Sequence, residues 1–257
     1  QIIQPIYLLC LCVGRTASAF LPSLHHHGSS SSAAVNHQRS RSTSIHATPF
    51  PEIIETPRIL VQKGMQSFCN NDVPSSLAYF DKADAATPNG SLKPFLWQRG
   101  ISYYYLDQFQ AGSDQFRLDV SVNPLDVEEI VWDIACLARM ENNGRVAASA
   151  EFPPEKRMAL PNGKKDRRRI MGTVYSLFRG DGATEYELRK AGHEGNISDE
   201  FYSLFYLGLY CEIRDETTKA ESYMKAAASS TYASGNGAGD YMSSCAKVHC
   251  KLRGWVA

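Results

Sequence analysis

The stretch that decides the fold is "FLWQRGISYYYLDQF", residues 95–109, which places a glycine inside an aromatic-rich helical pattern. The segment around Gly100 predicts an α-helix, yet a glycine in a helix interior costs about 1 kcal/mol relative to alanine. A sequence tolerates this cost where a neighbouring helix comes too close for any side chain. We therefore expect Gly100 to lie at a tight crossing of two helices.

Gly100 belongs to a pattern that repeats every 36 residues. Gly64 aligns with Gly100, and Phe80 aligns with Phe116. The other positions of this pattern are Pro88, Pro124, Trp132, Cys136, Gly172 and Gly208. Small residues at a fixed step inside amphipathic segments indicate closely packed helix pairs.

These positions resemble the tetratricopeptide repeat (TPR), whose pattern is W-x2-L-G-x2-Y, then A-x3-F, then P. In the second unit the matching residues are Leu96, Gly100, Tyr103, Phe116 and Pro124. The resemblance implies an all-α fold of TPR-like helix-turn-helix repeats, stacked into a right-handed superhelix with a C-terminal capping helix. The units are expected at about 57–88, 93–124, 129–160, 165–196 and 201–232, the third and fourth degenerate, and the cap at 240–254.

The first 47 residues differ in composition from the rest of the chain. The apolar run "IIQPIYLLCLCVG" precedes Ala17 and Ala19, an A-x-A arrangement that predicts a signal peptide over residues 1–19. Residues 20–47 are serine-rich, contain no acid and predict a disordered, transit-peptide-like segment before a repeat domain over 48–257. The "ASAF" sequence at 17–20 resembles the bipartite presequence of algae with complex plastids, which implies the chloroplast stroma or thylakoid surface. Simple secretion followed by a disordered linker is the alternative.

Charge and cysteine usage narrow the classes of function. After residue 47 the chain has 24 basic and 27 acidic residues, so its mild negative charge disfavours nucleic-acid binding. Five cysteines remain, an odd number without a C-x-x-C pair, and they predict no disulfide framework. Cys245, His249 and Cys250 would need further ligands to hold zinc, so we expect no metal and no cofactor.

The sequence gives little support to catalysis. Only His193 and His249 follow the leader, and neither is beside a nucleophile motif. Asp126, Glu128 and Glu129 cluster at the start of an expected helix, where capping and the helix dipole explain acidic residues. We therefore predict a protein that is not an enzyme; a hydrolase-like enzyme with an unrecognised site and a helical-repeat RNA-binding protein are the alternatives.

The predicted function is to bind another protein, through the concave face that stacked helix pairs form. The residues expected to line this aromatic groove are Met65, Phe68, Trp97, Ile101, Tyr104, Tyr202, Phe205 and Leu209. Two possibilities remain open: the groove is free for a partner, or the C-terminal helix or the 142–169 segment fills it. The basic sequence "NGKKDRRR" (162–169) is expected to be a solvated loop.

A further resemblance concerns the kind of partner. Residues 169–192 and 201–227 and the first two repeats are similar to NlpI-type lipoproteins, repeat proteins that act as adaptors for hydrolases and a protease. The similarity implies a scaffold, an assembly factor or a protease or hydrolase adaptor. Cys10 lacks the small residue expected before a lipidated cysteine, so a lipid anchor is not implied. We expect no membrane span in the mature chain, while peripheral membrane contact stays open.

Overall fold

In the computed structural model, the described residues are 55–142, 158–161 and 165–255, and they form helices and connecting turns without any strand. The predicted signal peptide and transit-like segment lie outside these residues. The helices are α1 (Pro57–Cys69), α2 (Val73–Ala85), η2 (Pro88–Gly90), η3 (Lys93–Phe95), α3 (Trp97–Tyr105), α4 (Phe109–Val122), α5 (Val127–Asn142), α6 (Arg169–Arg179), α7 (Glu185–His193), α8 (Ile197–Glu212), α9 (Thr217–Ala228), α10 (Thr231–Ser234) and α11 (Tyr241–Leu252). The predicted all-α class is confirmed.

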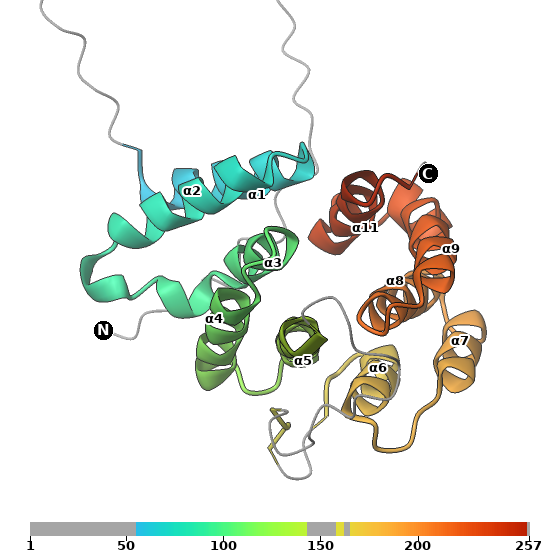
Figure 1. Cartoon of the computed structure of the whole chain (residues 1–257). Helices are drawn as coiled ribbons and strands as arrows, with labels where there is room; N and C mark the ends of the chain where they lie inside the picture. The colour runs from blue at the N-terminus through green and yellow to red at the C-terminus, as the bar shows by residue number, and fades with distance from the viewer. Residues whose placement is uncertain (1–54, 143–157, 162–164, 256–257) are drawn as a thin grey trace, which may run out of the picture.

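Helices that follow one another in the chain also lie beside one another in space. The pairs α1–α2, α3–α4, α6–α7 and α8–α9 pack as antiparallel neighbours, and α5 lies between α4 and α6 (Figure 1). The last helix, α11, packs on α9 and also contacts α1, so the two ends of the described helical array meet. This closure decides which inner surfaces stay accessible.

The close approach expected at Gly100 is present. A Cβ atom built at Gly100 would lie 2.6 Å from the ring of Phe116 in α4, and one at Gly64 would lie 2.9 Å from the ring of Phe80 in α2. At Gly208 the atom that comes within 2.9 Å belongs to Met224 of α9. In all three pairs the intruding side chain follows the glycine by 16 residues, so one contact fixes the crossing of each pair.

The turns that join these helix pairs repeat as well. Asn71, Asp107 and Asp215 have φ angles of 66°, 56° and 57° and follow their glycines by seven residues. Asparagine and aspartate tolerate this left-handed conformation better than other residues with a side chain. Five residues separate donor and acceptor in a matching backbone hydrogen bond at each turn: Asp72 to Ser67 at 2.9 Å, Gln108 to Tyr103 at 3.0 Å and Glu216 to Cys211 at 2.9 Å. The backbone conformation of the turn therefore repeats with the same 36-residue step as the glycine contact.

The α6–α7 pair departs from this step by one residue. Its left-handed turn residue is Gly180, with φ of 72°, and Asp181 donates to the carbonyl of Ser176 at 3.1 Å. Counting back seven residues from Gly180 reaches Thr173, so Gly172 is one position off the crossing. Accordingly, apart from the neighbouring backbone of α6, no atom of the described residues lies within 4 Å of a Cβ built at Gly172. The expectation that Gly172 fills the same role as Gly100 is wrong for this reason.

Aromatic side chains fill the space inside the array. Trp132 of α5 is buried and stacks against Phe116, with ring centroids 6.3 Å apart, and it also packs on Tyr104 and Phe205. Cys136, one turn further along α5, lies where a Cβ at Gly112 of α4 would come within 2.9 Å of its sulfur. The small residues at these positions let α4 and α5 approach closely.

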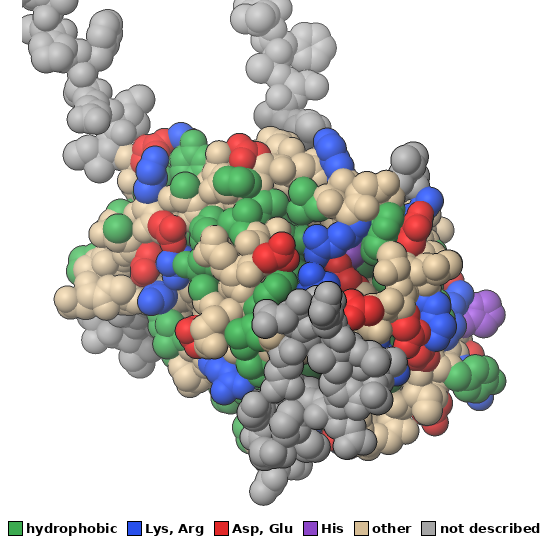
Figure 2. Space-filling view, in the orientation of Figure 1, with side chains coloured by type: hydrophobic (Ala, Val, Ile, Leu, Met, Phe, Trp, Pro, Cys, Tyr) green, Lys and Arg blue, Asp and Glu red, His purple; other side chains and the backbone are tan. Residues whose placement is uncertain are grey.

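The surface shows no concentration of one sign of charge on the face displayed in Figure 2. Acidic and basic side chains are interspersed there, and hydrophobic side chains gather over α1, α2 and α3. Every helix in the described ranges is too short or too polar to cross a lipid bilayer.

Substitution of Gly100 by alanine should destabilise the protein by about 1–3 kcal/mol, because the buried Phe116 ring is held by Trp132 and has no room to move. Gly172→Ala is the matched control: it meets open space inside α6, so it should gain up to about 1 kcal/mol of helix propensity. Urea unfolding followed by circular dichroism measures both. Effects of the same sign in the two variants would contradict the crossing.

Candidate functional site

Most of the predicted groove residues are enclosed by the chain itself. Phe68, Ile101, Tyr104, Phe205 and Leu209 are fully buried. Met65, Trp97 and Tyr202 are partly buried.

Helix α11 is what covers the groove at α1 and α3. Tyr241 stacks on Phe68 with ring centroids 5.3 Å apart and meets Trp97 edge-on at 5.4 Å. At the start of α11, Asp240 accepts a hydrogen bond from Tyr202 at 2.8 Å. Of the two possibilities that the sequence left open, the structure has the filled groove at this point, where Tyr241 of the C-terminal helix packs on Phe68 and Trp97.

A buried polar cluster fixes α11 in this place. Glu212 at the end of α8 accepts hydrogen bonds from Tyr104 at 2.7 Å and from Arg253 at 2.5 Å. His249 lies 3.5 Å from the same carboxylate, and its Nδ1 is 2.9 Å from the hydroxyl of Tyr105. Burial lowers the pKa of His249 to about 4, so its ring is neutral at neutral pH. The cluster thus joins α3, α8 and α11 through one carboxylate.

Removal of that carboxylate in Glu212→Ala should cost about 3–5 kcal/mol, because it leaves Arg253 and the buried Tyr104 hydroxyl without their acceptor. Glu194→Ala, which removes an exposed carboxylate at the end of α7, should change stability by less than about 0.5 kcal/mol. Chemical unfolding of both variants checks this. A cost below about 1 kcal/mol at position 212 would show that the cluster does not hold α11.

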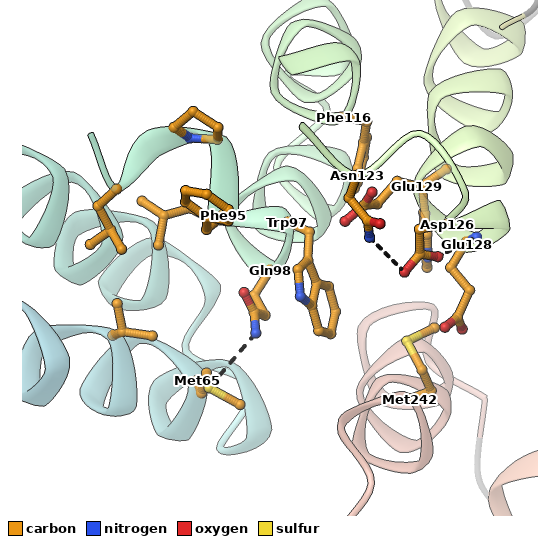
Figure 3. Close-up of a pocket in the computed structure, with 15 residues that line it drawn as sticks. Met65, Phe95, Trp97, Gln98, Phe116, Asn123, Asp126, Glu128, Glu129 and Met242 are labelled. Atoms are coloured by element: carbon orange, nitrogen blue, oxygen red, sulfur yellow. Dashed lines mark hydrogen bonds between the residues drawn. The ribbon is translucent and has the colours of Figure 1, made fainter. Parts of the chain in front are cut away.

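One pocket remains beside the filled groove, at the junction of α1, η3, α3, α4, α5 and α11 (Figure 3). Its volume is about 260 Å³. Two predicted groove residues, Met65 and Trp97, line it, together with the half-exposed Phe95 and with Met242 of α11. These side chains make the walls apolar and leave an opening at η3.

The opposite side of the pocket is acidic. Asp126, Glu128 and Glu129 all line it, at the beginning of α5. Two of these carboxylates have structural partners. Asp126 accepts the backbone N–H of Glu128 at 2.9 Å, and Glu128 accepts hydrogen bonds from Tyr206 and Arg168 at 2.6 Å each.

Glu129 differs from its two acidic neighbours. Its side chain is only 6% exposed, and its Oε2 has no hydrogen-bond partner among the described residues. Burial and the negative charges of Asp126, Asp119 and Glu128 raise the pKa of Glu129 to about 10. Asp119, which lies on α4 and accepts from Gln115 at 2.9 Å, has its pKa raised to about 8 by burial. The capping explanation expected from the sequence holds for Asp126 and fails for Glu129.

Two more buried polar atoms of this pocket have no hydrogen-bond partner in the part of the chain that the structure describes. They are Oε1 of Gln98, a residue 6% exposed, and the indole Nε1 of Trp132. Together with one carboxyl oxygen of Glu129, the pocket therefore has three buried polar atoms without a hydrogen-bond partner in the described ranges. Neither Gln98 nor Met242 could be identified as a pocket residue from the sequence, since only the packing of α3 and α11 brings them to one place.

The other candidates from the sequence have structural roles or lie apart. His193 is exposed at the end of α7 and does not line the pocket. Cys245 and His249 share a helix face, as expected, and both contact the hydroxyl of Tyr105. Arg168, expected in a solvated loop, pairs with Glu128 and Asp166, while residues 162–164 lie outside the described part.

One group of potential metal ligands occurs among the described residues. It consists of Glu185, Cys211 and Glu216. The ammonium of Lys219 lies 2.6 Å from Glu216 and 3.5 Å from Glu185, so a cation of the protein already pairs with both carboxylates. A carboxylate pair occupied by lysine does not define a metal centre.

Comparison with models of known families gave no match to this chain, and comparison with curated proteins gave none either. The fold and the pocket therefore have to carry the functional interpretation.

The raised pKa of Glu129 predicts a stability that falls with rising pH. The folded protein keeps the proton that the unfolded chain releases near pH 4.5, so this contribution is fully present below pH 4.5 and is lost as the pH rises toward 10. Glu129→Gln keeps the shape and removes the titration. It should be more stable than the unchanged protein by about 1–3 kcal/mol at pH 8 and equal to it near pH 4.

Thermal and urea unfolding between pH 4 and pH 8.5 test this, with Glu194→Gln as the exposed control. A pH profile unchanged by Glu129→Gln would show that the carboxyl is ionised in the folded protein.

Proposed function

We propose that this protein is a non-enzymatic TPR-type scaffold or adaptor that holds another protein. The observation that carries the proposal is the repeated helix pair: the same glycine contact and the same turn recur at Gly64, Gly100 and Gly208. Such arrays bind partners through preformed inner surfaces. The resemblance of the leader to bipartite presequences favours work inside a plastid.

The pocket is the part of the inner surface to which we assign the partner. Phe95, Trp97 and Met65 offer large apolar contact area around an opening, the composition that marks energetically dominant residues of interfaces. Because α11 already fixes the walls, the partner would meet a preformed site and the association would lose little free energy to ordering.

The alternative functions have less support. A nucleic-acid partner would bring phosphates toward the carboxylates of Asp126 and Glu128, which repel them. The side chains that line the pocket include no serine, cysteine or histidine, so a Ser-His or Cys-His nucleophile pair has no place there.

The test is a binding experiment with matched surface variants. Phe95 is 40% exposed and lines the pocket, whereas Tyr186 on α7 is 74% exposed and lies outside it. A partner recovered from plastid extract should bind Phe95→Ala at least about tenfold more weakly, which corresponds to roughly 1.4 kcal/mol, and should bind Tyr186→Ala normally. Equal affinity for both variants would move the binding surface away from the pocket.

A further inference from the structure

The unpaired acceptors of the pocket carry an inference about what enters it. Glu129 and Gln98 are each 6% exposed, and each has one oxygen without a hydrogen-bond partner. Buried acceptors of this kind cost free energy unless a donor reaches them. Nothing among the described residues supplies that donor, although Arg168 lies close enough to pair with neighbouring Glu128.

The walls restrict the donor to a particular shape. Met65, Trp97 and Met242 surround the space with sulfur, methylene and aromatic surface, and Glu129 lies beyond them at α5 (Figure 3). Lysine and arginine side chains combine an apolar stem with a charged tip that carries only donors. A tryptophan ring also attracts a cation positioned over its face. A neutral polar side chain would gain no electrostatic attraction from the acidic groups around Glu129.

We propose that this pocket binds the lysine or arginine side chain of the partner protein, with the stem against Met65 and Trp97 and the cation at Glu129. This inference rests on the proposed scaffold function and names the chemistry that the scaffold recognises. The partner would first contact Phe95 at the opening, and its cation would be recognised by Glu129 at the far side of the pocket.

Entry of the cation has a proton balance. In the empty pocket the carboxyl of Glu129 is protonated, so binding a cation converts the carboxyl to a carboxylate and releases one proton to solvent. The affinity should therefore increase with pH, by up to about tenfold per unit, below the pKa of that carboxyl.

The charged groups around Glu129 agree with this direction. They are Asp119 on α4, Asp126 and Glu128 on α5, Arg168 before α6, and Arg99 on α3, which acts on Asp119. The lining residues of α1 and α11 are the apolar Val61, Met65 and Met242. The acids act directly on Glu129, whereas the arginines act on its neighbours, so the local field favours a cation.

The experiment uses three small probes: acetyl-Gly-Lys-Gly-amide, its arginine analogue, and its norleucine analogue, which has the stem without the charge. Binding is followed by the indole N–H resonances of Trp97 and Trp132, which line the pocket, with that of Trp255, which packs on His249, as an internal reference. The lysine or arginine probe should give saturable shifts at the first two resonances and bind at least tenfold more tightly than the norleucine probe. Its affinity should rise between pH 6 and pH 8.

Glu129→Gln should weaken the charged probe at least tenfold and abolish the pH dependence, while Glu194→Gln should change neither. Because Glu129→Gln is expected to be the more stable protein, loss of binding cannot be ascribed to unfolding. Equal binding of the norleucine and lysine probes, or unchanged binding by Glu129→Gln, would overturn the inference.

The two proposals can fail separately. A partner that needs Phe95 but binds Glu129→Gln normally would support the scaffold and overturn the basic side chain. Charged probes that bind while no protein partner depends on Phe95 would assign the pocket to a free organic cation, and would overturn both the scaffold site and its basic peptide.

Discussion

The structure depends on one packing contact, an aromatic or methionine side chain pressed against the backbone of a glycine in the preceding helix. The contact recurs at Gly64, Gly100 and Gly208, and each time the partner follows by 16 residues. Because no Cβ fits there, the two helices of a pair can approach only in this arrangement. The first helix of each pair ends in a turn whose Asn or Asp adopts the left-handed conformation, and this turn sets the direction of the second helix.

The inner surface that these pairs create is largely consumed by the chain. Tyr241 of α11 packs on Phe68 and Trp97, and the carboxylate of Glu212 receives Tyr104 and Arg253. Apolar stacking provides the attraction, and the buried charge pair specifies one position for the helix, since an unpaired charge in that place would be costly. The pocket persists because α11 begins at its edge, with Met242 as the last wall.

Sequence reasoning predicted the features that depend on short-range geometry. Gly100, a glycine in a helix interior, predicted the tight helix crossing at that position. The 36-residue repeat of such positions predicted the all-helical class. The sites that depend on the position of α11 could not be predicted from the sequence. Tyr104 and Phe205 have the aromatic character of an open groove, yet both pack on Trp132 of α5 and are buried.

The acidic residues at the start of α5 also show which features can be predicted from the sequence and which cannot. Asp126, Glu128 and Glu129 look alike as acids at the start of a helix, and capping explains the first. The partner of Glu128, Arg168, is 40 residues away in the sequence. Glu129 differs because no described residue of α3, α4 or α11 donates a hydrogen bond to its Oε2. Gly172 lies one residue away from the crossing position of its helix pair. The left-handed turn residue Gly180 marks this shift in the sequence, but an alignment with a fixed 36-residue step does not detect it.

The position of α11 decides which inner surfaces are covered, and one cross-link tests it. The thiol of Cys69 on α1 contacts the side chain of Ser244 on α11. Mild oxidation of Ser244→Cys should therefore give a disulfide between positions 69 and 244, identified by mass spectrometry, whereas Ser229→Cys at the exposed end of α9 should give none with Cys69. Failure of the first bridge, with both thiols still reactive, would mean that α11 does not cover α1 and that the aromatic groove is open.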